Sequence, residues 1–323
     1  MGAQQETVVR RMLAGWGDGT VAMDIDGIAA CFSDQARWTL YMPDGPTVVG
    51  RDAIRTELHR QASYLQQVVS EVVLIASSDD MVMAERRDRF MREGKTIERS
   101  VAGAFEIDTE GRISAWRDYF DGFDFARQTG VSADEISGLE SRPSSKDLDR
   151  RPPIPEAGDG SGLPLALQAP QGPEQVFVQA FCDAWGDGTA ASRPDVDRIL
   201  AMMASNAEWR LWVPGGPLIQ GRDALRAEID RQITYSGHNK CNTVHAASSA
   251  RVVMQERSDW AVLVGRPCPH QMIAVYELDD DGLIIHWREY INMADLDRKR
   301  GVKAETAHAQ ASLETEPATK ALP

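Results

Sequence analysis

The sequence predicts two tandem α+β domains, each a cone-shaped, curved antiparallel sheet with helices packed on one side. The main observation is an internal repeat: WGDGT at positions 16–20 returns at 185–189, 169 residues later. Three further motifs, GRDA (50–53), ERRD (85–88) and WRDY (116–119), return 171 residues later as GRDA, ERSD and WREY. Because three separated motifs share one offset, we interpret the chain as a tandem duplication of a unit of about 130 residues.

The order of elements within each unit is helices first and strands afterwards. Two helical patterns flank WGDGT between residues 5 and 32, and residues 50–64 carry apolar side chains at helical spacing. Strands are predicted at 72–77, 81–90, 96–107 and 113–120, separated by the turn-type clusters SSDD, REGK and DTEGR. Short connections between long strands indicate an antiparallel sheet with the helices on one face.

The domain boundaries follow from composition. The first domain is predicted at 1–130 and the second at 172–301. Residues 131–171 hold six of the 16 prolines and have little apolar periodicity, so they are interpreted as a linker. The stretch 302–323 is predicted to be a disordered tail.

Composition excludes several classes of function. The chain of 323 residues has 49 acidic and 35 basic side chains, a net charge of −14, which disfavours nucleic acid and membrane partners. The four cysteines are scattered without CxxC spacing, and no apolar run or leader pattern is found, so a cytoplasmic protein with reduced thiols is expected. The six histidines lack metal-ligand spacing and WGDGT lacks phosphate-loop spacing, so neither a metal nor another cofactor is predicted.

The ERRD segment carries the first candidate chemistry. In a strand, Arg86 and Asp88 share a face with apolar neighbours, and a charged pair on such a face must find compensating charge. On the last strand Asp118 lies between Trp116 and Phe120 on one face. If the strands are neighbours, the three charges converge in an apolar pocket, where two carboxyls can have different pKa values. An ordinary cross-strand ion pair remains the alternative.

The second repeat keeps much of this pattern. Arg257 and Asp259 stand at the matching spacing, and Glu289 replaces the last-strand aspartate. Retention in two copies favours a role for the cluster, although an inherited structural ion pair would look the same.

These motifs resemble a known family. Arg-x-Asp on one strand, W-R-D-Y-F-D on the last, and M-P followed by a G-R-D-A helix start are similar to the limonene-1,2-epoxide hydrolase and polyketide-cyclase-like (SnoaL-like) branch of the nuclear transport factor 2-like superfamily. The resemblance covers about residues 8–130 and 176–301. It implies that Asp88 acts as acid on an oxirane oxygen, Asp118 acts as base on water, and Arg86 bridges them.

The chain departs from the family pattern at the water-binding pair. The family places a Tyr and an Asn two apart before Met-Pro, where this sequence has Thr39 and Tyr41, and the second copy has Arg210 and Trp212. Thr39 could hold a water and Tyr41 could act as a phenolic donor. The first copy is therefore expected to be the main catalyst, with Asp118 ionised, Asp88 protonated and a bell-shaped pH profile.

Two classes of function follow from the sequence. The first is a cofactor-independent acid–base enzyme for a small apolar or aromatic molecule, either an epoxide hydrolase or a lyase or dehydratase of an aryl diol. The second is a non-catalytic binding module. The predicted substrate-contacting residues are Trp38, Phe90, Trp116 and Phe120. The two domains are expected to pair through their sheets as an intramolecular pseudo-dimer, with further homo-oligomerisation left open.

Overall fold

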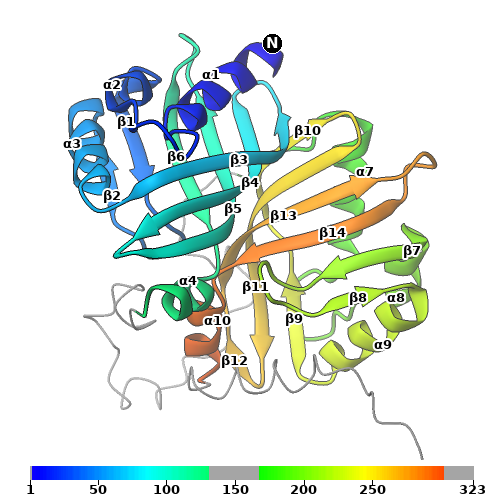
Figure 1. The fold of residues 1–323 in the computed structure, drawn as a ribbon. Helices are drawn as coiled ribbons and strands as arrows, with labels where there is room; N and C mark the ends of the chain where they lie inside the picture. Colours follow the sequence, from blue (N-terminus) through cyan, green and yellow to red (C-terminus); the bar gives the residue numbers. More distant parts are fainter. Residues whose placement is uncertain (1, 131–166, 302–323) are drawn as a thin grey trace, which may run out of the picture.

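The structure is a computed structural model that describes residues 2–130 and 167–301. The predicted tail and all of the predicted linker except 167–171 lie outside the described residues. Elements of the first half are α1 (Gly2–Ala14), α2 (Ile25–Ala29), β1 (Phe32–Thr39), β2 (Thr47–Val49), α3 (Arg51–Ala62), β3 (Gln66–Ser77), β4 (Met81–Arg92), β5 (Lys95–Ile107), β6 (Ile113–Tyr119) and α4 (Gly122–Thr129). Helices α1, α2 and α3 lie on the outer side of the sheet (Figure 1).

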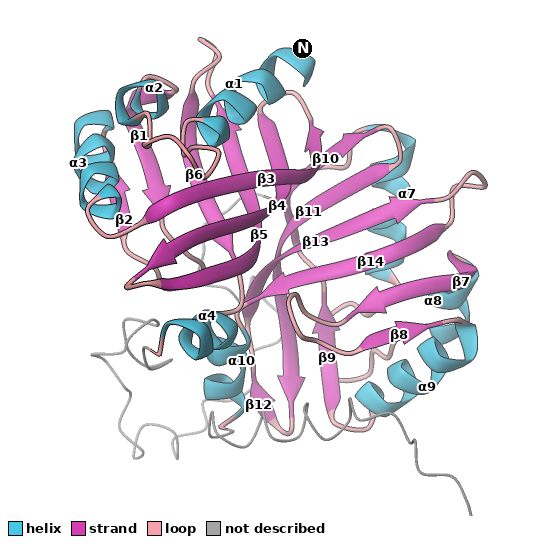
Figure 2. Ribbon diagram, in the orientation of Figure 1, coloured by secondary structure: helices cyan, strands magenta, loops and turns pink. Residues whose placement is uncertain are grey.

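The second half repeats this order with one strand divided. Its elements are α7 (Gly172–Asp183), α8 (Val196–Ala201), β7 (Met203–Arg210), β8 (Leu218–Gln220), α9 (Arg222–Ile233), β9 (Ser236–Lys240), β10 (Thr243–Ser249), β11 (Val252–Leu263), β12 (Arg266–Pro267), β13 (His270–Leu278), β14 (Ile284–Ile291) and α10 (Met293–Arg300). Strands β9 and β10 together take the place of β3, because both pair with β11. The duplicated architecture is visible in Figure 2.

Each domain has a mixed sheet, so the expectation of a purely antiparallel sheet is corrected. The order is β2-β1-β6-β5-β4-β3 in the first domain, and β1 runs parallel to β6. The same parallel contact joins β7 to β14. The strand β1 was missed in the sequence because only Phe32, Ala36 and Trp38 are buried among polar neighbours.

Strand alternation divides β4 between two faces, as predicted. Val82, Ala84 and Phe90 belong to the core beneath the helices of the first domain. Met83 and Glu85 point to the opposite face, where a second core contains side chains of both domains. This shared core includes Met83, Ala102, Ala104 and Tyr119 of the first domain and Met254, Ile273, Val275 and Tyr290 of the second.

The domains contact each other through their sheets in a reciprocal arrangement, and β3 of the first domain pairs with β10 of the second at Ser77 and Ser248. Glu85 accepts hydrogen bonds from Arg288 (2.7 and 2.8 Å) and from Tyr290 (2.6 Å). Glu256, the repeat equivalent of Glu85, accepts them from Arg117 (2.5 and 2.7 Å) and from the Tyr119 hydroxyl (2.7 Å). In both the E-x-x-D and the W-R-x-Y motif, therefore, some side chains point into the pocket and others point toward the neighbouring domain.

Within the described ranges, no helix combines the length and apolar character needed to cross a membrane.

Candidate active site

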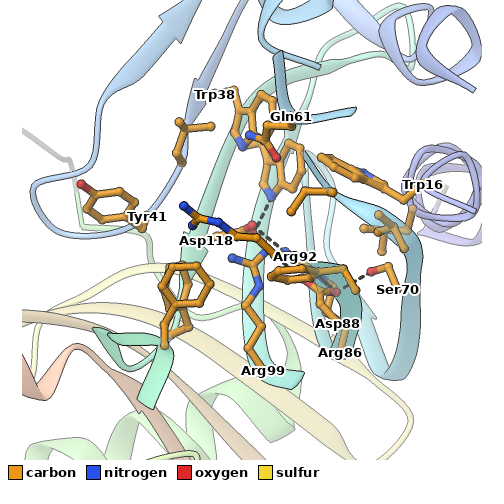
Figure 3. A pocket seen from close by; sticks show the side chains of 18 of the residues that line it. Trp16, Trp38, Tyr41, Gln61, Ser70, Arg86, Asp88, Arg92, Arg99 and Asp118 are labelled. Atoms are coloured by element: carbon orange, nitrogen blue, oxygen red, sulfur yellow. Dashed lines mark hydrogen bonds and ion pairs between the residues drawn. The ribbon is translucent and has the colours of Figure 1, made fainter. Parts of the chain in front are cut away.

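A pocket of about 350 Å³ opens in the first domain between helices α1 and α3 and the face of the sheet that these helices cover. Its floor contains Arg86, Asp88 and Asp118, whose side chains are 2%, 8% and 4% exposed. All three point toward one another in Figure 3. The sequence prediction that these charges converge is thus matched by their placement.

Arg86 bridges the two carboxyls. Its Nε donates to Asp88 Oδ1 at 3.1 Å, and its Nη2 donates to Asp118 Oδ2 at 2.5 Å. Strand β5 separates β4 from β6, and Gly103 on β5 leaves room for the guanidinium to cross. A Cβ at residue 103 would lie 2.6 Å from Arg86 Nη1, so the arginine occupies space that only glycine leaves free.

Asp88 receives more donors than the sequence predicted. Besides Arg86, Ser70 Oγ donates to Asp88 at 2.7 Å and Arg99 Nη2 donates at 3.1 Å. Burial alone would raise the pKa of Asp88, but the charges of Arg86 and Arg99 and the Ser70 hydrogen bond outweigh it and hold the pKa below its ordinary value. The expectation that Asp88 keeps its proton is therefore wrong.

Asp118 lies in the opposite situation. Burial raises the pKa of Asp118 above its ordinary value, and the charge of Arg86 offsets that effect only in part. Its other partner is the indole of Trp116, whose Nε1 donates to Asp118 Oδ1 at 2.7 Å. Asp118 is consequently the carboxyl of the pair with the higher pKa.

The four residues predicted to contact the substrate, Trp38, Phe90, Trp116 and Phe120, all line the pocket. Trp38 and Trp116 stack with ring centroids 4.5 Å apart, and Trp16 meets both edge-on. Trp16 belongs to WGDGT, which forms a turn after α1 in which Asp18 accepts from the backbone N–H of Thr20 at 2.8 Å.

The structure directs neither of the two candidate water-binding side chains, Thr39 and Tyr41, toward Asp118. Thr39 is absent from the pocket lining, and its hydroxyl pairs with that of Thr47 at 2.9 Å. Tyr41 lines the pocket, but Figure 3 shows its hydroxyl turned away from Asp118. Burial and the nearby charge of Asp44 raise the pKa of Tyr41. Neither residue is placed to hold a water against Asp118.

The second domain assembles a related but altered cluster. Arg257 Nη2 lies 2.7 Å from Asp259 and 3.1 Å from Glu289, and Arg257 Nη1 donates to Tyr276 at 2.6 Å. Burial, reinforced by the negative charge of Asp259, raises the pKa of Glu289 to about 7, despite the opposing charge of Arg257. This cluster holds its arginine with a tyrosine that the first domain lacks.

The other second-copy candidates have structural contacts. Arg210 Nη1 donates to the carbonyl of Gly216 at 2.9 Å. Trp212 packs against the apolar cluster of Cys268, Met272, Ile291 and Leu296. No group of three or more His, Cys, Asp or Glu side chains suited to a metal ion occurs in the described parts of the chain.

Arg99 and Ser70 were not predicted as site residues, although the sequence holds a signal for Arg99 in the turn between the two strands. The turn at Glu93–Gly94 has positive φ at both residues, the form that favours a two-residue hairpin. Counting outward from that turn pairs Asp88 with Arg99, as the register shows. Ser70 could not be placed in this way, because β3 contains register shifts between residues 66 and 74.

Family comparisons agree with the two-domain organisation. Residues 8–130 match the model of the limonene-1,2-epoxide hydrolase catalytic domain, and residues 178–287 match that of the SnoaL-like domain.

Several solved structures resemble one part of the chain. An LEH-like epoxide hydrolase of M. tuberculosis shares 22% identity, covering 42% of this chain and 98% of that one, with a TM-score of 0.35. A protein of Catenulispora acidiphila with a ketosteroid isomerase-like fold shares 20% identity, covering 39% and 95%, with a TM-score of 0.35. A putative polyketide cyclase of Xanthomonas campestris shares 18% identity, covering 40% and 98%, also with a TM-score of 0.35.

Proposed function

We propose that this chain is a cofactor-independent acid–base enzyme. It belongs to the nuclear transport factor 2-like proteins and consists of a limonene-1,2-epoxide hydrolase-type domain followed by a SnoaL-like domain. Its substrate is a small apolar or aromatic molecule, and its reaction is the hydrolysis of an epoxide. The observation that carries this proposal is the Asp88–Arg86–Asp118 cluster at the floor of an aromatic pocket. The reaction takes place in the first domain, and we place the protein in the cytoplasm.

Asp118 is the general base in this proposal. A buried carboxylate with a raised pKa accepts a proton more strongly than one in water. Asp118 removes a proton from a water molecule while the water oxygen bonds to one oxirane carbon. The C–O bond breaks with its electron pair on the oxygen, and Asp118 then returns the proton to that alkoxide.

Asp88 has a different role from the one that the family resemblance implies. With hydrogen bonds from Ser70, Arg86 and Arg99 it stays ionised, so it holds no proton to donate near neutral pH. We propose that Asp88 fixes the guanidinium of Arg86, which in turn orients Asp118. A pre-positioned charge of this kind needs no rearrangement during the reaction.

A lyase or dehydratase reaction on an aryl diol is the second candidate. The observation that favours it is the position of Thr39 and Tyr41, which leaves both water-binding positions of the family without a group directed at Asp118. A single carboxyl that removes and returns a proton suffices for water loss or C–C cleavage.

The experiment that tests the proposal uses a panel of apolar epoxides and aryl diols incubated with the full chain in ¹⁸O-labelled water. Mass spectrometry that finds one ¹⁸O in a diol product supports hydrolysis. Formation of an alkene, a carbonyl product or formaldehyde supports the lyase reaction whatever its label, because carbonyl oxygens exchange with water. Asp118→Asn should abolish most turnover with ligand affinity retained, and Asp259→Asn in the second domain is the matched control.

The outcome that would contradict both reactions is tight binding of panel members without turnover at any pH. That result would support a binding module instead.

A further inference from the structure

The pocket of the first domain is lined by more positive than negative side chains. Four arginines line it, Arg60, Arg86, Arg92 and Arg99, but only two acids, Asp88 and Asp118. The whole chain has a net charge of −14, so this excess is a local property of the pocket. A locally positive cavity in an acidic protein concentrates anions at that site alone.

Two of the four arginines are already compensated. Arg86 lies between Asp88 and Asp118 on the pocket floor. Arg60 donates through Nε and Nη2 to both oxygens of Glu57, at 2.7 and 2.5 Å. These two arginines are therefore poorly available to a ligand.

Arg99 is compensated only in part. Its Nη2 donates to Asp88 at 3.1 Å, while its Nε is buried and has no hydrogen-bond partner in the part of the chain that the structure describes. Its guanidinium carbon lies 5.0 Å from the ring centre of Phe120 and 5.6 Å from that of Phe90. The aromatic rings hold the guanidinium in place and supply no negative charge that pairs with it.

Arg92 has weaker compensation still. Its acidic partner is Glu93, whose Oε1 lies 3.6 Å from Arg92 Nε and whose side chain is 79% exposed. Its guanidinium carbon lies 5.6 Å from the ring centre of Tyr64. Arg92 and Arg99 both come from the β4–β5 hairpin and point into the pocket in Figure 3.

We infer that the substrate is an aromatic or apolar carboxylate, whose carboxylate group is bound by Arg92 and Arg99 while its ring system lies against the tryptophan wall. This inference rests on the proposed function and names the substrate class of the same site. Guanidinium groups suit a carboxylate because they donate parallel hydrogen bonds to its two oxygens. The side chains of Arg92 and Arg99 are 32% and 24% exposed, so the carboxylate would lie nearer the entrance than the reacting atoms at Asp118.

The second domain lacks both arginines. Its equivalents are Leu263 for Arg92 and His270 for Arg99, at the offset of 171 residues. Burial holds the pKa of His270 below its ordinary value, so this imidazole is neutral at neutral pH. Recognition of the carboxylate is therefore confined to the first domain.

The test is a binding measurement with two probes of equal size, 2-naphthoate and naphthalene-2-carboxamide. Calorimetry on the full chain at pH 7.5 should show the carboxylate bound at least about tenfold more tightly than the amide. Arg92→Gln and Arg99→Gln should each remove most of that preference and leave the affinity for the amide unchanged. Arg92 pairs with Glu93, whereas Asp88 accepts from Ser70, Arg86 and Arg99, so the Arg92 variant tests the inference without disturbing Asp88.

The matched control is Arg89→Gln, which removes one positive charge from the exposed face of the same strand. It should leave both affinities unchanged, and the preference of the wild type should weaken as salt is added. Equal affinity for the two probes, no binding of either at millimolar concentration, or an equal effect of Arg89→Gln and Arg92→Gln would overturn the inference. Binding requires no turnover, so a chain that prefers the carboxylate but converts no epoxide or aryl diol, including those that carry a carboxylate group, refutes the proposed function alone.

Discussion

Asp88 and Asp118 contact the same guanidinium, yet the two carboxyls differ in the donors that surround them. Asp88 accepts from Ser70 and from two arginines, whereas Asp118 accepts from Arg86 and one indole. The additional positive charge lowers the pKa of Asp88, and burial raises the pKa of Asp118. The division of labour between the two carboxyls therefore depends on Arg99.

The pH dependence of the reaction reports this division. Asp118 must be ionised to act as base, so kcat/KM should increase with pH through an apparent pKa above 3.8, the ordinary value for aspartate. In Arg99→Gln the pKa of Asp88 should rise, because one of the charges that lowers it is gone. The measurement is a pH–rate profile of both proteins, and an acidic limb at or below pH 3.8 in the wild type would contradict the assignment.

The raised pKa of Glu289 predicts that the stability of the second domain depends on pH. Its folded pKa, about 7, lies above the ordinary value of 4.5, so its contribution to stability is complete below pH 4.5 and is lost as the pH rises through 7. The change amounts to about 3 kcal/mol over that window. Urea unfolding at pH 5 and pH 8 should show a smaller pH effect for Glu289→Gln than for the wild type. Parallel curves for the two proteins would refute this prediction.

The sequence predicted the charged triad because strand alternation needs only the spacing of Arg86, Asp88 and Asp118. It could not predict the protonation order, since that depends on Arg99 and Ser70 from neighbouring strands. The same limit applies to Thr39, whose side-chain direction is set by the pairing of β1 with β2. Residue spacing within a strand was informative, whereas contacts between strands required the register.

At the scale of elements, the middle strand β5 controls the site through Gly103. Gly103→Ala would place a methyl group 2.6 Å from Arg86 Nη1 and 2.9 Å from the ring of Phe105. Arg86 is held by two carboxyls and cannot move without breaking one contact, so turnover should fall at least about tenfold.

Steady-state kinetics together with circular dichroism check this effect on a folded protein. The second repeat has Ala274 at the equivalent position, so Ala274→Gly is the control and should leave turnover unchanged. Full activity of Gly103→Ala would show that the position of Arg86 does not matter for the reaction.

Strands β4, β5 and β6 of the first domain were predicted with nearly correct bounds, because apolar alternation and turn clusters mark them. Strand β3 was predicted at 72–77 but begins at Gln66. Strand β2 is a short edge strand, and polar residues interrupt the apolar pattern of β1 beside it. The parallel pairing of β1 with β6 is a non-local contact that local periodicity cannot reveal.

At the scale of the whole molecule, the two domains share a core and two buried glutamates. Glu256→Gln would leave the charge of Arg117 without its main buried partner. Breaking one side of a buried ion pair costs roughly 3–5 kcal/mol, and Glu85→Gln should have a similar effect through Arg288.

Chemical denaturation measures these losses, with Glu71→Gln on an exposed position of β3 as control. If Glu256→Gln and Glu85→Gln are as stable as that control, the interdomain ion pairs do not stabilise the molecule. A stable, monomeric fragment 1–130 would likewise argue against a required pairing of the domains.

The central claim is that Asp118 in the first domain performs the acid–base chemistry. The most direct measurement is kcat/KM of Asp118→Asn and of Glu289→Gln, its counterpart in the second domain, on the best substrate of the epoxide and diol panel. We predict a loss of about 10²–10⁴-fold for Asp118→Asn and a change within about threefold for Glu289→Gln. The reverse result, an inactive Glu289→Gln beside an active Asp118→Asn, would contradict the account and assign the reaction to the second domain.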